Sequence, residues 1–107
     1  MSEIKNIFAD IPRDLLDEYF DEILKAGTLR IERIVSRGHA SPKGHWDDQD
    51  HHEWVILLRG HARLRFQKDN EIVELMPGNH VNIPAHVKHR VEWTDPESDT
   101  LWLAVHY

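Results

Sequence analysis

The sequence predicts an all-β domain, a small sandwich or barrel, preceded by one short α-helix. Short runs of alternating apolar and polar residues recur from residue 29 to residue 106, and Gly and Pro separate them. Before residue 28 the apolar residues recur at helical spacing instead. A length of 107 residues suffices for one hydrophobic core, and no linker or internal repeat divides the chain. We therefore expect a single domain over 1–107, with a helix over about 12–26 and a barrel over about 28–107.

The expected helix rests on capping residues and on an amphipathic pattern. Asp10 can cap the first turn, and Pro12 suits that turn because its missing N–H costs nothing there. Gly27 suits the position just past the end of the helix. The apolar face would consist of Leu15, Leu16, Tyr19, Phe20, Ile23 and Leu24.

The barrel strands are expected wherever the period is two and turn residues flank the run. An Asp69-Asn70 pair should form a hairpin turn, and Pro77-Gly78 another turn. The expected strands cover about 29–34, 54–58, 62–67, 72–75, 80–83, 91–93 and 100–106.

Composition excludes several classes of function. A net charge of −6 argues against a nucleic-acid partner, since phosphate binding needs clustered Lys and Arg. The chain has no cysteine, which excludes disulfides, thiolate metal sites and thiol nucleophiles. Its longest apolar run is far too short to cross a bilayer, and its first residues lack the apolar region of a signal peptide. We therefore expect a cytoplasmic protein without a membrane partner.

The stretch from Gly44 to Gly60 concentrates potential ligand atoms. It places Asp47, Asp48, Gln49, Asp50, His51, His52 and Glu53 directly before an apolar strand. A second stretch with donor atoms follows Pro84 and ends at His89. Oxygen and imidazole donors on a loop that is anchored by rigid strands make a metal or small-ligand site.

These two stretches resemble the motifs of the cupin superfamily. The second cupin motif, a glycine, five residues and then Pro-x-Gly-x-x-His, is matched from Gly78 through Pro84 to His89, with His86 in place of the inner glycine. The end of the first motif, a glutamate with a glycine seven residues on, is matched by Glu53 and Gly60. The run from Trp46 to Leu58 resembles a bacterial single-domain, RmlC-like cupin subgroup of uncharacterised function. The resemblance covers about residues 29–106 and implies a double-stranded β-helix, the cupin jelly-roll barrel.

The resemblance also implies a metal site, which this chain matches in part. Glu53 and His89 stand where the family has two of its ligands. Counting back from Glu53 to the usual His-x-His pair reaches Trp46 and Asp48 at the common spacing, or Asp47 and Gln49 at the shorter one. The expected metal ligands are therefore Glu53 and His89 with one or two of Asp48 and Gln49. This oxygen-rich set suits a divalent ion such as Fe, Mn, Ni or Zn, and softness allows no finer choice.

Several alternatives to this ligand set remain open. His51 lies two residues before Glu53, on the same face if the strand already runs there, so it could replace Asp48 or Gln49. The run from Asp47 to Asp50 also suits a solvated acidic loop. Glu53 and His89 could instead form a buried hydrogen-bonded pair in a barrel without metal.

Two functions follow from the resemblance, and the sequence does not separate them. The first is a small metal-binding cupin, in the stronger form a metal-dependent enzyme acting on a small organic molecule. The second is a non-catalytic small-molecule-binding module with a sensor or storage role, which could be metal-free. No catalytic residue is assigned.

A homodimer is the expected assembly. A barrel of this size has a high ratio of surface to volume, and the open edges of its sheets need cover. Closed two-fold pairing is the commonest way to bury such a surface.

Overall fold

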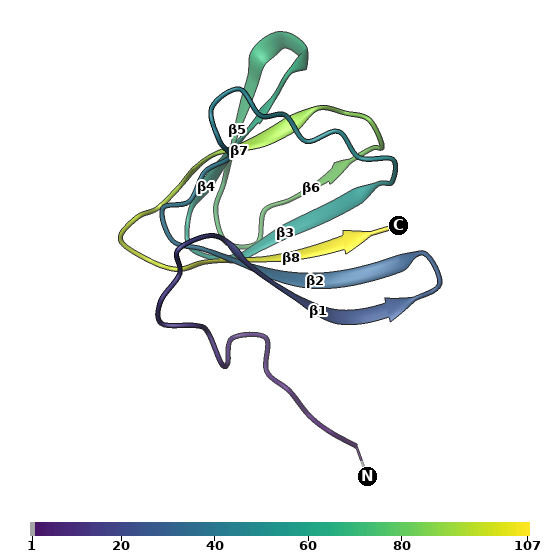
Figure 1. The fold of residues 1–107 in the computed structure, drawn as a ribbon, viewed down its shortest axis with the longest axis vertical. Coiled ribbons are helices and arrows are strands. Elements are labelled where there is room, and N and C mark those ends of the chain that lie inside the picture. Colours follow the sequence, from purple (N-terminus) through teal and green to yellow (C-terminus); the bar gives the residue numbers. More distant parts are fainter. Residues whose placement is uncertain (1) are drawn as a thin grey trace.

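The computed structural model describes residues 2–107, which form eight strands and one short 3-10 turn (Figure 1). Five strands make one antiparallel sheet in the order β1-β2-β8-β3-β6, and three make a second in the order β5-β4-β7. The elements are β1 (Tyr19–Ala26), β2 (Leu29–Ser36), β3 (Glu53–Arg59), β4 (Ala62–Phe66), η1 (Lys68–Asn70), β5 (Glu71–Leu75), β6 (His80–Ile83), β7 (His89–Thr94) and β8 (Thr100–His106). Within the described part of the chain, no helix has the length and apolar character needed to cross a membrane.

The expected N-terminal helix over about 12–26 is wrong. Residues 12–18 are irregular, and Tyr19–Ala26 is strand β1, which pairs antiparallel with β2 from Tyr19↔Val35 to Ala26↔Leu29. Gly27 does adopt a left-handed conformation, with φ 59°, but it turns a hairpin instead of ending a helix. A bulge between Glu22 and Leu24 shifts the register, so the apolar positions need not keep a period of two. Pairing with β2 has overridden a local helical pattern.

The barrel strands lie where the sequence predicted them. The run from residue 54 to 58 falls within β3, and the run from 100 to 106 lies within β8. Asp69 and Asn70 both have positive φ, 60° and 52°, at the tip of the β4–β5 hairpin. Short polar side chains tolerate that conformation, as the turn prediction assumed.

The chain crosses between the two sheets several times, and the sheets face each other across a common interior (Figure 1). The β3–β4 turn at Gly60 and the β5–β6 turn at Gly78 are two of these crossings. Strand β3 lies between β6 and β8, and β4 lies between β5 and β7. Residues at the start of β3 and of β7 can therefore reach the same interior space.

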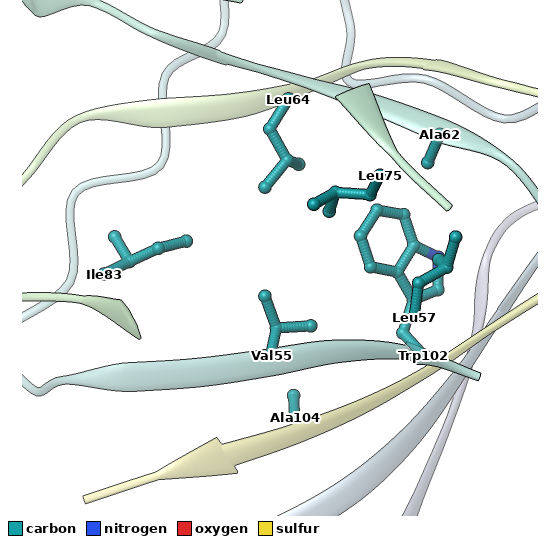
Figure 2. Packing of buried hydrophobic residues seen from close by; sticks show 8 residues of the cluster. All are labelled: Val55, Leu57, Ala62, Leu64, Leu75, Ile83, Trp102 and Ala104. Atoms are coloured by element: carbon teal, nitrogen blue, oxygen red, sulfur yellow. The ribbon is translucent and has the colours of Figure 1, made fainter. Parts of the chain in front are cut away.

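The hydrophobic core fills one end of this interior. Side chains from both sheets meet around Trp102, which is 3% exposed (Figure 2). The members of the cluster are Val55, Leu57, Ala62, Leu64, Leu75, Ile83, Trp102 and Ala104. The candidate site adjoins this core, because Val55, Leu64, Ile83 and Trp102 also line the cavity between the sheets.

Candidate functional site in the barrel

A cavity of about 410 Å³ opens between the two sheets. Its apolar wall includes Val55, Leu64 and Trp102, which belong to the hydrophobic core as well. The polar part of the wall comes from the start of β3, from His89 on β7, from β2 and β8, from the loop before β3, and from Asp17 and Glu18 before β1. An apolar pocket with a few convergent polar groups is the usual form of a small-molecule site.

Glu53 and His89 face each other across this cavity. Their side chains are 11% and 7% exposed, and 3.9 Å separates Glu53 Oε1 from His89 Nε2. The Nδ1–H of His89 donates to the backbone oxygen of Val87 at 2.9 Å. In a neutral ring that bond leaves the proton on Nδ1 and the lone pair on Nε2, the nitrogen 3.9 Å from Glu53.

The loop before β3 is tied down so that alternate residues face the cavity. Asp47 forms an isolated bridge with His89, with N–H···O distances of 2.7 and 3.2 Å, and the N–H of His86 donates to the backbone oxygen of Gln49 at 2.7 Å. Gln49 and Asp47 line the cavity, and the Gln49 amide donates to Glu53 Oε1 at 3.2 Å. Asp48 points the other way, with its side chain 42% exposed and 2.8 Å from His86 Nδ1. The geometry thus matches the shorter of the two motif spacings.

His86 occupies the glycine position of the second motif in a left-handed conformation, with φ 64°. A non-glycine residue pays about 1–2 kcal/mol for this conformation. The contact between His86 and Asp48 and the bond from the His86 N–H to Gln49 offset part of that cost. The loop geometry that glycine usually permits is therefore kept with a histidine.

A second polar group lies around His106, which the sequence analysis did not single out. His106 Nε2–H donates to Glu32 Oε1 at 2.7 Å, and His106 Nδ1 accepts from His51 Nε2 at 2.9 Å. Both Glu32 and His106 line the cavity, and the hydrogen bond from His106 is the main cause that lowers the pKa of Glu32. The other ring nitrogen of His51, Nδ1, contacts Asp50 Oδ1, so neither ring nitrogen of His51 is directed at Glu53. The available signal was the period of two over residues 29–34, which puts Glu32 on the opposite face of β2 from Arg33.

Glu18 is a further carboxylate that the sequence did not single out. Ser36 Oγ donates to Glu18, and the same Ser36 Oγ accepts from the indole N–H of Trp102 at 3.1 Å. Burial raises the pKa of Glu18, against the opposing effect of the bond from Ser36. Glu18 precedes β1 and lines the cavity, a position that depends on the segment being irregular instead of helical.

The donor set fits a divalent metal in part. Two donors each about 2.1 Å from one ion lie about 3.4 Å apart at a tetrahedral angle, so the 3.9 Å between Glu53 and His89 would have to shorten by about 0.5 Å for them to share an ion. Gln49 is the nearest further donor, and a 180° rotation of its amide presents the carbonyl oxygen at the same place. No group of three or more His, Cys, Asp or Glu side chains suited to a metal occurs within residues 2–107. A third ligand would therefore be an uncharged amide.

Comparisons with known proteins place this fold. No protein-family model matches the chain, and no curated protein matches it. Among solved structures, a "putative mannose-6-phosphate isomerase" from Ralstonia eutropha JMP134 is 43% identical, with a TM-score of 0.93. The match covers 98% of this chain and 97% of that one.

More distant structures share the same architecture. A cupin superfamily protein from Desulfitobacterium hafniense DCB-2 is 15% identical, with a TM-score of 0.72 over 90% of this chain and 82% of its own. The FeII form of HppE is 14% identical, with a TM-score of 0.72 over 91% of this chain and 53% of its own. At these identities the likeness concerns the fold alone. Together with the two cupin motifs and the close relative, it shows that this chain belongs to the RmlC-like cupin superfamily.

Proposed function

We propose that this protein is a metal-binding cupin that holds a small organic molecule in the barrel cavity. Glu53 and His89 would hold a divalent ion, Fe, Mn, Ni or Zn, with Gln49 as the third and weaker ligand. The observation that carries the proposal is the buried pair itself, in which His89 Nε2 faces a carboxylate at 3.9 Å with its other nitrogen already bonded.

Electrostatics supports an ion at this place. A buried carboxylate is costly unless a cation or several hydrogen bonds compensate it. Within residues 2–107, the one side-chain hydrogen bond that Glu53 accepts comes from the neutral Gln49 amide. A bound divalent ion would supply positive charge beside Glu53, and it would act as a Lewis acid towards an oxygen of the bound molecule.

The chain's own residues would bind and orient the molecule. Val55, Leu64 and Trp102 offer it an apolar wall, and Glu32, held in place by His106, offers a fixed hydrogen-bond acceptor. The proposal concerns binding, and it assigns no residue to a chemical step.

A metal-free binding module is the second candidate. It is favoured by the lack, among the described residues, of three charged or imidazole donors grouped for a metal. In that case Glu53, Gln49 and His89 would form part of a polar wall that contacts the ligand directly.

Metal titration separates the two candidates. Calorimetry of chelator-stripped protein with Mn²⁺ and Zn²⁺ should give saturable binding that Glu53→Gln and His89→Ala each weaken about 100-fold or more, equivalent to about 2.7 kcal/mol. His61→Ala and Glu74→Gln are matched controls, because that His–Glu pair lies on the outer surface with side chains 27% and 53% exposed. Equal metal affinity in wild type and His89→Ala would refute the metal site and favour the metal-free module.

A further inference from the structure

The wall of the cavity carries more acidic than basic side chains. Five carboxylates line it, and in the described part of the chain no lysine or arginine does. Four histidines also line it: His39 contacts backbone groups, whereas His45, His89 and His106 lie next to Asp47, Glu53 and Glu32. The five acidic residues are Asp17, Glu18, Glu32, Asp47 and Glu53.

Two neighbouring arginines form hydrogen bonds with other groups of the protein. Arg33 binds Asp21 and the backbone oxygens of Ile7 and Ala9, on the outer side of the sheet. Arg90 donates to the backbone oxygens of Ser41 and Pro42. Arg30 shares the face of β2 with Glu32 and lowers its pKa, but it lies outside the lining of the cavity. The lining therefore has five carboxylates and no Lys or Arg side chain among the residues that the structure describes.

Two of these carboxylates each accept a hydrogen bond from the protein on one oxygen only. Glu32 Oε1 is bonded to His106 and Glu18 Oε2 to Ser36, while among residues 2–107 the second oxygen of each accepts no hydrogen bond. Carboxylates held by protein donors keep their orientation when a ligand arrives. Their remaining lone pairs suit hydroxyl or ammonium donors.

We infer that this cavity selects a small hydroxyl- or amine-bearing molecule without a phosphate group, and that Glu32 and Glu18 are its specificity-determining acceptors. A phosphate group carries about −1.5 to −2 charges at neutral pH and needs Arg or Lys to bind it. It would meet carboxylates here instead. The inference rests on the proposed function, and it separates this chain from the phosphosugar substrate that the name of its Ralstonia relative implies.

Three matched sugars test the inference: mannosamine, mannose and mannose 6-phosphate, which differ mainly in charge. The indole N–H of Trp102 is the NMR reporter, because it is bonded to Ser36 beside Glu18 and the residue lines the cavity. Titrations of metal-free and Zn²⁺-loaded protein should give saturable shifts, with mannosamine binding at least about tenfold more tightly than mannose 6-phosphate. Mannose should fall between them.

The variants locate the effect. Glu32→Gln should reduce the preference for mannosamine over mannose several-fold, and about 0.5 M NaCl should reduce it in the wild type. Glu71→Gln, at an exposed position on β5, should leave it unchanged. Tightest binding of mannose 6-phosphate, no saturable shift with any sugar, or an unchanged preference in Glu32→Gln would each overturn the inference. Sugar binding without any metal binding would refute the proposed metal site and leave this selectivity standing.

Discussion

At the scale of single residues, the loop orients Asp48 and Gln49 differently, and this predicts their order as metal ligands. Gln49 lines the cavity, whereas Asp48 is bonded to His86 outside it. In the metal titration, Gln49→Ala should therefore weaken binding several-fold, and Asp48→Ala should change it less, although only the aspartate carries charge. The reverse order of the two variants would indicate the longer motif spacing and a rearranged loop.

The sequence alone predicted part of this site. Glu53 and His89 were found because each falls at a motif position, and the structure brings both to the cavity. Glu32 and His106 were missed because their contact joins residues far apart in the chain, and neither has a donor beside it in sequence. Glu18 was missed for another reason, since it lies within residues 12–26, where the sequence predicted a helix that does not form.

At the scale of elements, the sheet crossing at Gly60 is the most constrained turn. Gly60 has φ 96°, and a Cβ there would lie 2.4 Å from Thr100 Oγ1 and 2.6 Å from Thr100 Cα. Gly78 turns another crossing with φ 93°, but a Cβ there would meet nothing within 4 Å. The two glycines therefore differ in steric room and share their backbone conformation.

This difference predicts unequal effects of alanine. Gly78→Ala should lower the free energy of unfolding by about 1–2 kcal/mol through backbone strain. Gly60→Ala adds a backbone clash and should lower it by at least about 3 kcal/mol. Urea unfolding of both variants measures this, and equal losses would show that the β3–β4 corner can shift at little cost.

The first element shows why the fold was predicted better than its N-terminus. The barrel strands combine a period of two with turn residues, and these two signals agree. In residues 12–26 the capping residues and the helical spacing agreed as well, yet the edge of β2 was available and β1 paired with it. Gly27 fits either outcome, because a helix end and a tight hairpin both use positive φ.

At the scale of the whole molecule, β1 leaves an exposed edge with apolar side chains. It is the outer strand of the five-stranded sheet, and Phe20, Ile23 and Leu24 are 54%, 49% and 49% exposed. An open apolar edge of this kind favours pairing with a second copy. The homodimer thus remains a prediction, and the β1 edge is the interface that we expect.

Light scattering at micromolar concentration tests the dimer. The wild type should have about twice the chain mass of 12.6 kDa, and Leu24→Lys should shift it towards the monomer. Ile72→Lys is the matched control, because Ile72 on β5 is also 49% exposed. A wild-type mass near that of one chain would show that the β1 edge stays unpaired.

The central claim is that Glu53 and His89 hold a metal, and the metal content of the untagged protein as purified tests it most directly. Elemental analysis should find one divalent transition metal at a substantial fraction of one ion per chain in the wild type and in His61→Ala. His89→Ala, prepared in parallel, should contain almost none. Equal metal content in wild type and His89→Ala, whether high or absent, would contradict the account.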